Sequence, residues 1–510
     1  MGNDYNLREP SADLRIHGLE NRIQQFVVVG AGSAGLMSSM AIKRAFPTRK
    51  VVLVYAPEIP VIGVGESTTT IFPGFLHRSL GLGYLDFFRQ VEPSWKLGIR
   101  FHWGDPKDTH FNYVFDHCMT HKPAPLRKLT AYYCLDDWTD ASRCWALMDR
   151  GLSPCHVEPD GGLSTYVAFG NHINNEKFLK YLMKKSQELG VEHRPTKIVG
   201  VERNACGNLT SLQTDDGNQL TGDLFVDCSG FQSRLLGDVM QQPFVSYRDS
   251  LFCDRAVVGG WQRNSPILPY TTVDTMNHGW CWRIEFPDRV TRGYVYSSEF
   301  CSDDQAIEEL KSKNPELESK PRVLSFQSGR RQNFWVGNVV GIGNATGFVE
   351  PLEATALHLV IEQIRLLCRV IDESEGDLPP KLIESANQRY RQLWDEVRDF
   401  LAIHYRFNRR KNTPFWQHCR EATYLAGAQD LVNLYQEAGP TSLCSTTLDG
   451  GHLFGYDGFM SILVGSRAPT RYANRMSIDD LRRWHACQTK NQHAASNALT
   501  VRDALDRLGV

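Results

Sequence analysis

The most constraining feature of this sequence is a glycine-rich turn between a hydrophobic run and a helical segment. Residues 25–29 (QFVVV) are typical of a buried parallel strand. The turn that follows carries Gly30, Gly32 and Gly35, and residues 36–46 have a helical pattern. In dinucleotide-binding folds these glycines permit the tight turn, the approach of a pyrophosphate, and close packing of helix on strand. The pattern therefore predicts a helix N-terminus that faces a dinucleotide phosphate.

The strand that follows ends without the acidic residue that usually accompanies this turn. Residues 51–54 form a second apolar run, and Tyr55 stands where dinucleotide folds usually place an acid that binds the ribose. The nearest acid is Glu58. We therefore expect Glu58 or backbone groups around Ala56 to make this contact, or the adenosine end to be held loosely.

Two later segments favour FAD over NAD as the dinucleotide. Residues 224–230 read as a strand that ends in Asp227 and a glycine turn, although any buried strand before a turn could give this pattern. Residues 339–345 form a further strand and glycine turn, and residues 348–353 predict a helix start with acids in its first turn. Such a helix N-terminus can face phosphate or isoalloxazine. The long insertion between these segments is similar to that of FAD enzymes with a split nucleotide domain.

The composition excludes several classes of function. The 56 basic and 58 acidic residues nearly cancel, which argues against a nucleic-acid partner or a strongly basic membrane-binding surface. The 13 cysteines include no Cys-x-x-Cys pair, so we expect reduced thiols and no metal site. The N-terminal residues lack the apolar core of a signal peptide, and no apolar run reaches the ~20 residues that span a bilayer. These features predict a cytoplasmic protein without a membrane span.

The expected fold is α/β, an FAD-binding Rossmann-like fold of the flavin monooxygenase type, with a substrate-facing sheet and a helical C-terminal part. We expect an N-terminal extension over residues 1–24, a core over 25–375, and a mainly helical region over 376–510 that covers the substrate pocket. The flavin-binding part of the core would be discontinuous, and residues 270–296 would belong to the sheet. The predicted flavin-binding segments are residues 25–103, 191–237 and 329–370. In the C-terminal region we predict one long amphipathic helix over residues 383–407 and two polar helices within residues 477–508.

Several sequence blocks, in this order, resemble the flavin-dependent halogenases of the tryptophan-halogenase family. They include the glycine turn, a block similar to the family's flavin-binding strap, one similar to its G-W-x-W-x-I-P signature, and one similar to its F-x-E-P-L-E-S-T helix start. The blocks are residues 30–35, 62–68 (IGVGEST), 95–101 (WKLGIRF), 279–284 (GWCWRI), 348–355 (FVEPLEAT) and 412–416 (NTPFW).

The resemblance implies a reaction and a set of site residues. Reduced FAD and O₂ would oxidise a halide to hypohalous acid, which passes through a tunnel to Lys96. Lys96 would form a haloamine or hold the acid by hydrogen bonding, and Glu353 would assist transfer of the halogen to an electron-rich aromatic carbon. The halide would lie beside the backbone of Thr355 and Ala356. The cofactor-binding residues would be Gly30, Gly32, Ala34, Gly35, Val64, Gly65, Ser67, Asn344 and Leu357.

Physical reasoning supports some of these roles and leaves alternatives open. Free hypohalous acid reacts indiscriminately, so selectivity needs a fixed point of transfer, and a desolvated lysine amine near a carboxylate can serve as one. However, strict strand alternation places Lys96 with Gly98 and Arg100, opposite the apolar Trp95 and Leu97. Periodicity alone therefore does not bury Lys96, and the alternative is a surface lysine.

The other candidates have structural alternatives too. Trp280 and Trp282 share one face of a predicted strand, where two indoles could block the substrate from the flavin. They could equally be a pair of core tryptophans. Glu353 could be an acid in the first turn of a helix, stabilised by the helix dipole, and Glu350 is its neighbour three residues earlier.

The sequence departs from the family pattern at several positions. Glu285 replaces the proline of the signature, Ala354 replaces a serine, and Ala356 replaces a glycine beside the expected halide site. Residues 445–456, which would correspond to the segment that closes over free tryptophan in some members, are glycine-rich and poor in acids. We therefore predict an open pocket and a substrate other than free tryptophan, such as indole or another electron-rich aromatic.

No second G-x-G-x-x-G turn and no obvious NAD(P)H site are apparent in the sequence. We therefore expect FADH₂ to come from a separate NAD(P)H-dependent flavin reductase, and a homodimer is left open. The main alternative is a single-component aromatic hydroxylase, which would bind NAD(P)H and need no catalytic lysine. A flavin-binding homologue without activity is a further alternative, because of Glu285.

Overall fold

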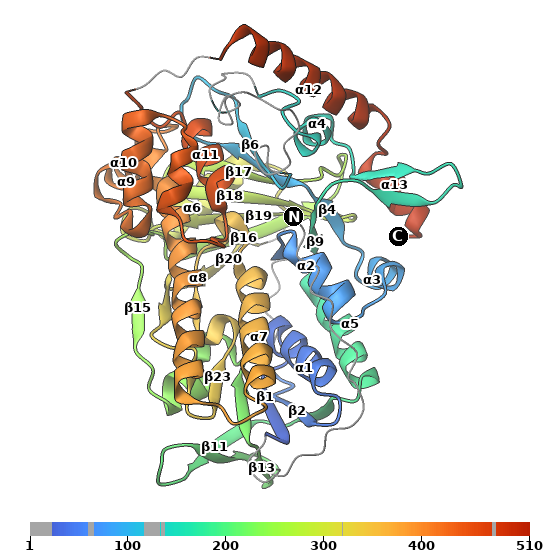
Figure 1. Cartoon of the computed structure of the whole chain (residues 1–510), viewed down its shortest axis with the longest axis vertical. Helices are drawn as coiled ribbons and strands as arrows, with labels where there is room; N and C mark the ends of the chain where they lie inside the picture. Colours follow the sequence, from blue (N-terminus) through green and yellow to red (C-terminus); the bar gives the residue numbers. More distant parts are fainter. Residues whose placement is uncertain (1–22, 60–65, 117–132, 134–137, 319, 472–475) are drawn as a thin grey trace.

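A mostly parallel sheet built around the glycine-rich turn forms one end of the molecule (Figure 1). The computed structural model describes residues 23–59, 66–116, 133, 138–318, 320–471 and 476–510. Segments far apart in the sequence pair side by side in this sheet, as the pattern of strands predicts. Its strands, in spatial order, are β10 (Glu192–Pro195), β2 (Lys50–Tyr55), β1 (Gln25–Val29), β14 (Leu224–Asp227), β23 (Val339–Gly341) and β22 (Trp335–Val336), of which only β22 is antiparallel to its neighbour.

Both faces of this sheet are covered, which explains why β1 is apolar at nearly every position. Phe26 and Val28 pack into the main core, whereas Val27 and Val29 pack into a second cluster with Leu212 of the neighbouring small sheet. Helix α1 (Ser33–Ala45) packs against α5 (Asn175–Glu188) and α7 (Ala356–Glu373). The small sheet contains β11 (Ile198–Arg203), β12 (Leu209–Thr214) and β13 (Gln219–Thr221).

A seven-stranded sheet forms the middle of the molecule (Figure 1). It is antiparallel except where β17 and β5 run parallel. Its strands are β20 (Arg322–Ser325), β16 (Arg255–Gln262), β19 (Arg289–Tyr296), β18 (Gly279–Glu285), β17 (Thr271–Met276), β5 (Gly98–His102) and β6 (Phe111–Val114). A separate three-stranded sheet contains β3 (Glu66–Ser67), β9 (Gly170–Ile173) and β4 (Ser94–Lys96). The chain passes from this sheet into the seven-stranded sheet at Leu97, the one residue between β4 and β5.

The C-terminal part is helical, as expected. Helix α8 (Pro380–Phe407) runs along the molecule from the parallel sheet towards the opposite end (Figure 1), and it begins three residues before the predicted start, with proline at its first turn. The two predicted polar helices are α12 (Ile478–Ser496) and α13 (Val501–Leu508). Between them and α8 lie α9 (Pro414–Ala422), α10 (Gln429–Ala438) and α11 (Gly455–Gly465). None of the helices in the described residues is both long and apolar enough to cross a membrane.

Shorter elements connect these layers. They are α2 (Ile71–Gly74), α3 (Tyr84–Val91), α4 (Arg143–Arg150), α6 (Asp303–Lys313), β7 (Cys155–Val157), β8 (Leu163–Thr165), β15 (Phe244–Ser246), β21 (Gly329–Arg331) and β24 (Gly347–Phe348).

Candidate active site

The three glycines of the first turn have different structural requirements. Gly30 has a φ of 104°, and a Cβ there would lie 2.4 Å from the carbonyl oxygen of Cys228. A Cβ on Gly35 would lie 1.8 Å from the carbonyl oxygen of Gly30, so this glycine permits the helix to pack against the strand. Gly32 is exposed at the N-terminus of α1, and its Cβ would meet no protein atom within 4 Å. The turn thus leaves open backbone at a helix N-terminus, which fits a pyrophosphate.

This contrast predicts different outcomes for two alanine substitutions. Gly35→Ala should lower the free energy of unfolding by about 3 kcal/mol, because its methyl group overlaps the turn. Gly32→Ala should change it by less than about 0.5 kcal/mol, because its backbone is extended and its Cβ meets no protein atom. FAD titration should nevertheless show at least about tenfold weaker binding to Gly32→Ala, since the second glycine of this turn is expected to let the backbone approach the pyrophosphate. Unchanged FAD affinity in a folded Gly32→Ala protein would contradict this placement of the cofactor.

The third glycine turn lies against the first. A Cβ on Gly343 would lie 3.0 Å from the Cβ of Ala34, so the start of α1 and the short helix η5 (Gly343–Ala345) are in contact. Asn344 is exposed on η5, and Leu357 is buried in the first turn of α7. The first and third glycine turns thus meet after the carboxyl ends of β1 and β23, and they carry Ala34 and Asn344, two of the expected flavin contacts.

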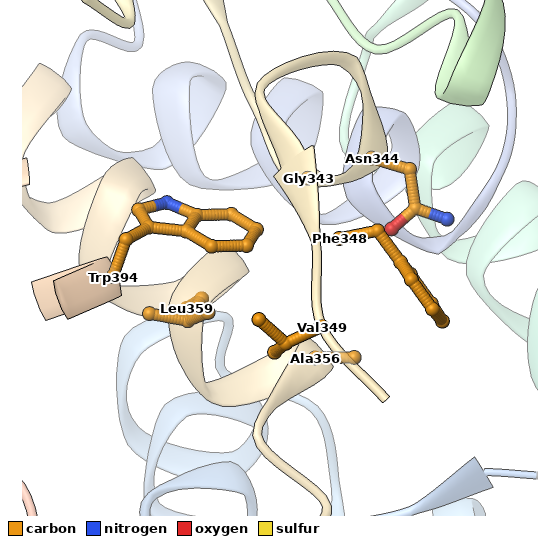
Figure 2. Close-up of a pocket in the computed structure, with 7 residues that line it drawn as sticks. All are labelled: Gly343, Asn344, Phe348, Val349, Ala356, Leu359 and Trp394. Carbon is orange, nitrogen blue, oxygen red and sulfur yellow. The ribbon is translucent and has the colours of Figure 1, made fainter. Parts of the chain in front are cut away.

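A small pocket lies between this turn and α7 (Figure 2). The volume in which the centre of a water molecule can move is about 10 Å³, so the pocket has room for about one particle of that size. Its lining residues are Gly343, Asn344, Phe348, Val349, Ala356, Leu359 and Trp394. Ala356, predicted to lie beside the halide, is therefore at a cavity of ion-like size.

The start of α7 has free hydrogen-bonding groups. Thr355 precedes the helix and makes no capping bond, and its buried Oγ1 has no hydrogen-bond partner among the described residues. The first turn of α7 contains no acidic residue. Backbone N–H groups in this turn are therefore available to an anion.

Lys96 is fully buried, which strand alternation did not predict. The expected single strand is two strands in different sheets: β4 pairs with β9, where Lys96 lies opposite Gly170, and β5 begins at Gly98. The alternation argument fails because the chain changes sheet at Leu97 and because both faces of β4 are buried. Among the described residues, the Nζ atom of Lys96 has no hydrogen-bond partner, and it lies 5.2 Å from the ring centre of Phe115.

The protonation of Lys96 is perturbed by this environment. Burial lowers the pKa of Lys96 to about 7, although the charge of Glu353 acts in the opposite direction. Burial likewise raises the pKa of Glu353, against the opposing effects of His404 and Lys96. Neutral amine is therefore abundant near neutral pH, and a neutral amine can accept a hydrogen bond or a halogen. An unpaired buried amine of this kind is rare unless it serves a reaction.

Glu353 is buried beside α7 but does not belong to its first turn. It ends the one-turn helix η6 (Pro351–Glu353), and Ala354 follows in a left-handed conformation with a φ of 56°. The predicted helix start is interrupted there, so α7 begins only at Ala356. The Oε1 atom of Glu353 lies 2.8 Å from Nε2 of His404 on α8.

The two signature tryptophans share a buried face of β18, as their spacing predicts. Trp280 and Trp282 have ring centres 5.9 Å apart. The indole of Trp282 lies over Gly293, where a Cβ would be 1.8 Å from the ring. The indole nitrogen of Trp280 donates to the hydroxyl of Tyr405, 3.2 Å away, and that hydroxyl donates to Glu350 at 2.8 Å.

Two residues of α8 at this site were missed by the sequence reasoning: His404, which contacts Glu353, and Tyr405, which contacts Glu350. The available signal was a histidine and a tyrosine on the apolar face of a predicted long helix. Such residues are more often core residues, so the pattern alone could not select them.

The remaining predicted contacts are less central. Ser67 on β3 is half-buried and lies 3.0 Å from the hydroxyl of Thr271. Tyr55 is half-buried with its ring edge against His193, and Glu58 is exposed. Val64 and Gly65 lie outside the described residues.

Comparison with known proteins decides the class of this site. A model of the tryptophan halogenase family matches residues 25–479. The chain belongs to this family. It is therefore a flavin-dependent halogenase, and membership implies FAD and a halide as its co-reactants.

Relatives of the halogenase share most of its length. Tryptophan 7-halogenase KtzQ of Kutzneria sp. (strain 744) is 32% identical over 464 residues, 86% of each chain. Tryptophan 7-halogenase RebH of Lentzea aerocolonigenes is 30% identical over 451 residues, 82% of this chain and 83% of RebH. The crystal structure of MibH, a lathipeptide tryptophan 5-halogenase, superimposes with a TM-score of 0.88 at 33% identity, covering 98% of this chain and 94% of MibH.

The unusual Glu285 of this halogenase is a buried, charge-paired residue. Its carboxylate lies 2.5 Å from Arg263 and 2.6 Å from Arg283, and its backbone oxygen accepts a hydrogen bond from Ser94, two residues before Lys96. The two arginines thus compensate for the burial of the carboxylate. Glu285, where the family signature has proline, thus forms ion pairs with Arg263 and Arg283 through its side chain, whereas its contact with Ser94 uses only the backbone.

Glu285→Gln should therefore destabilise the halogenase by about 3 kcal/mol, because it leaves Arg263 buried without its carboxylate. Urea unfolding measures this loss. Glu299→Gln is the matched control, because Glu299 pairs with Arg248 on the exposed surface and should contribute less than about 1 kcal/mol. Equal stability of the two variants would show that the ion pairs of Glu285 do not stabilise the fold.

Proposed function

We propose that this halogenase transfers a halogen from hypohalous acid held at Lys96 to an electron-rich, indole-type ring that is not free tryptophan. The observation that carries the proposal is the buried Lys96 amine, which has no hydrogen-bond partner among the described residues and whose pKa lies near neutrality. An amine in this state can receive the acid by hydrogen bonding or become halogenated. A fixed amine then limits which ring carbon the halogen reaches.

Other residues of the chain would supply the reactants. Reduced FAD, when bound, would react with O₂ and so supply the oxidant that converts the halide to hypohalous acid. The glycine turn and the residues around η5 and α7 would hold the cofactor, and the free N–H groups after Thr355 and at Ala356 would bind the halide. The paired indoles of Trp280 and Trp282 would separate the substrate from the flavin, which suppresses direct hydroxylation. FAD-binding residues would be Gly30, Gly32, Ala34, Gly35, Ser67, Asn344 and Leu357, with Val64 and Gly65 on the strap.

The substrate proposal rests on the C-terminal segment and on the relatives. Residues 445–456 contain a single acid, Asp449, which is exposed. The segment itself would therefore offer a zwitterionic amino acid one acidic side chain. KtzQ and RebH act on position 7 of tryptophan, whereas MibH is a lathipeptide tryptophan 5-halogenase. An indole carried by a larger molecule suits a pocket without a lid for the free amino acid.

We further propose that a separate NAD(P)H-dependent flavin reductase supplies the FADH₂. The sequence has one G-x-G-x-x-G turn, and that turn is assigned here to FAD. The purified protein alone should therefore consume NADPH no faster than a buffer control. Rapid NADPH consumption without a reductase would favour the single-component hydroxylase instead.

The decisive assay supplies FAD, a flavin reductase and NADH, with chloride, bromide or iodide in parallel. Indole, free tryptophan and a short tryptophan-containing peptide are compared as substrates by mass spectrometry. We expect halogenated indole or peptide and at least about tenfold less product from free tryptophan. Preferential halogenation of free tryptophan would overturn the substrate proposal, and hydroxylated products alone would overturn the proposed reaction.

A further inference from the structure

The histidine that contacts Glu353 has both ring nitrogens engaged. His404 is fully buried on α8, and its Nδ1 lies 2.9 Å from the carbonyl oxygen of Phe400, one turn earlier. A carbonyl oxygen only accepts, so Nδ1 carries a hydrogen and donates it. Its Nε2 lies 2.8 Å from Oε1 of Glu353. The rings of Phe101, Trp103 and Phe400 surround the imidazole, with ring centres within 6.5 Å.

This arrangement fixes the number of protons on the pair. A neutral imidazole has one N–H, and that hydrogen is used at Phe400. Nε2 would then present a lone pair to Glu353, and an ionised carboxylate would present another. At 2.8 Å this contact requires a hydrogen between the two atoms. The pair is therefore either a carboxylic acid with a neutral imidazole, or a carboxylate with an imidazolium.

The neighbouring titratable groups are compatible with one shared proton. Lys96 faces Glu353 from β4, and burial favours its neutral amine. Tyr113 on β6 interacts with Glu353 and with Asp457 of α11, and burial keeps its hydroxyl protonated. With a neutral Lys96 and one shared proton, the buried Lys96–Glu353–His404 group has no net charge, which is the least costly state in a low-dielectric site.

We propose that His404 is a positioning residue that keeps one transferable proton on the Glu353–His404 pair during halogen transfer. This inference rests on the proposed function. Glu353 donates the shared proton to the hydroxyl oxygen of hypohalous acid as the oxygen–halogen bond breaks, and water leaves with that electron pair. A ring π-electron pair forms the carbon–halogen bond. The ring C–H proton then passes to Glu353, which restores the pair; the sum is arene plus hypohalous acid giving haloarene plus water.

His404→Gln provides the test, because a glutamine amide can still donate to Glu353 but cannot share a proton. We expect kcat to fall about 10- to 100-fold with the KM for the aromatic substrate changed less than about threefold. The high-pH limb of the kcat profile should move at least one pH unit lower, because Glu353 alone must then keep the proton. A hypohalous acid scavenger should also trap more oxidant per turnover.

The outcomes separate this inference from the proposed function. Absence of halogenated product from the wild type would overturn the proposed function itself. A wild type that halogenates, with a His404→Gln profile that has an unchanged high-pH limb, would overturn the role of His404 alone. A lower kcat at all pH values with that limb unchanged counts as the same negative result, because it indicates a merely structural role.

Nuclear magnetic resonance of the wild-type enzyme, labelled with ¹⁵N-histidine, gives a second test that does not require a folded His404 variant. We expect one histidine with a protonated Nδ1 and a strongly downfield proton shared between Nε2 and the carboxyl group of Glu353. That proton should disappear in Glu353→Gln, whose amide can only donate an ordinary hydrogen bond to Nε2. A buried neutral histidine without the downfield proton in the wild type would overturn the proposal.

Discussion

The Lys96→Met variant should lose at least about 1000-fold of the rate of halogenated product formation while it remains folded. Methionine has a similar length and suits a fully buried position, but it offers no amine to hypohalous acid. Without the amine, the oxidant is neither held nor oriented, and orientation and proton transfer each contribute factors of 10² or more to such reactions. Initial rates with saturating halide and substrate, measured by mass spectrometry, give the loss.

The fate of the oxidant distinguishes this mechanism from a simple loss of flavin chemistry. Lys96→Met should still oxidise FADH₂, and a scavenger should now intercept hypohalous acid that the wild type directs to the ring. Lys107→Met is the matched control, because Lys107 is exposed beyond the end of β5 and should leave the rate unchanged. If Lys96→Met gives regioselective product at the wild-type rate with the scavenger present, halogen transfer does not pass through Lys96.

The sequence predicts the flavin-binding end of this fold well, because its signals are local. The apolar run, the glycine turn and the helix are contiguous in the sequence, and together they favour one local structure, a strand followed by a tight turn and a helix. The strands predicted around Asp227 and Val340 also form, because buried parallel strands are continuous apolar runs, and the structure pairs them in one sheet with β1. The helix over 383–407 is predicted by its periodicity, and α8 matches it closely.

The chemistry of the site is less predictable, because it depends on contacts between distant segments. Lys96 is buried because both faces of the short strand β4 are covered, whereas an alternation rule assumes one continuous strand with one exposed face. Glu353 and His404 are 51 residues apart, and their contact depends on how α8 crosses η6. In the sequence, Glu285 is only a departure from the family signature. Its ion pairs with Arg263 and Arg283 become apparent only in the folded structure.

Lys96→Met should also stabilise the halogenase near pH 7, and this gain should shrink as pH rises. The pKa of Lys96 is lowered by burial from 10.5 to about 7, so between these values the unfolded chain binds a proton that the folded protein does not. Stability of the wild type therefore rises with pH across this window. The variant lacks this dependence, so its advantage should fall by about 3.5 kcal/mol between pH 7 and pH 10, with a slope of about 1.4 kcal/mol per pH unit in the middle of this window.

Urea unfolding of both proteins at pH 7, 8, 9 and 10 measures the difference, in which the contributions of other titrating groups cancel. Lys107→Met is the control for this difference, because it removes an exposed lysine and leaves the core unchanged. A constant difference between Lys96→Met and the wild type would mean that Lys96 keeps its proton in the folded protein. Loss of activity combined with a gain in stability would instead identify Lys96 as an amine retained at a cost to the fold, because halogen transfer requires it to be neutral.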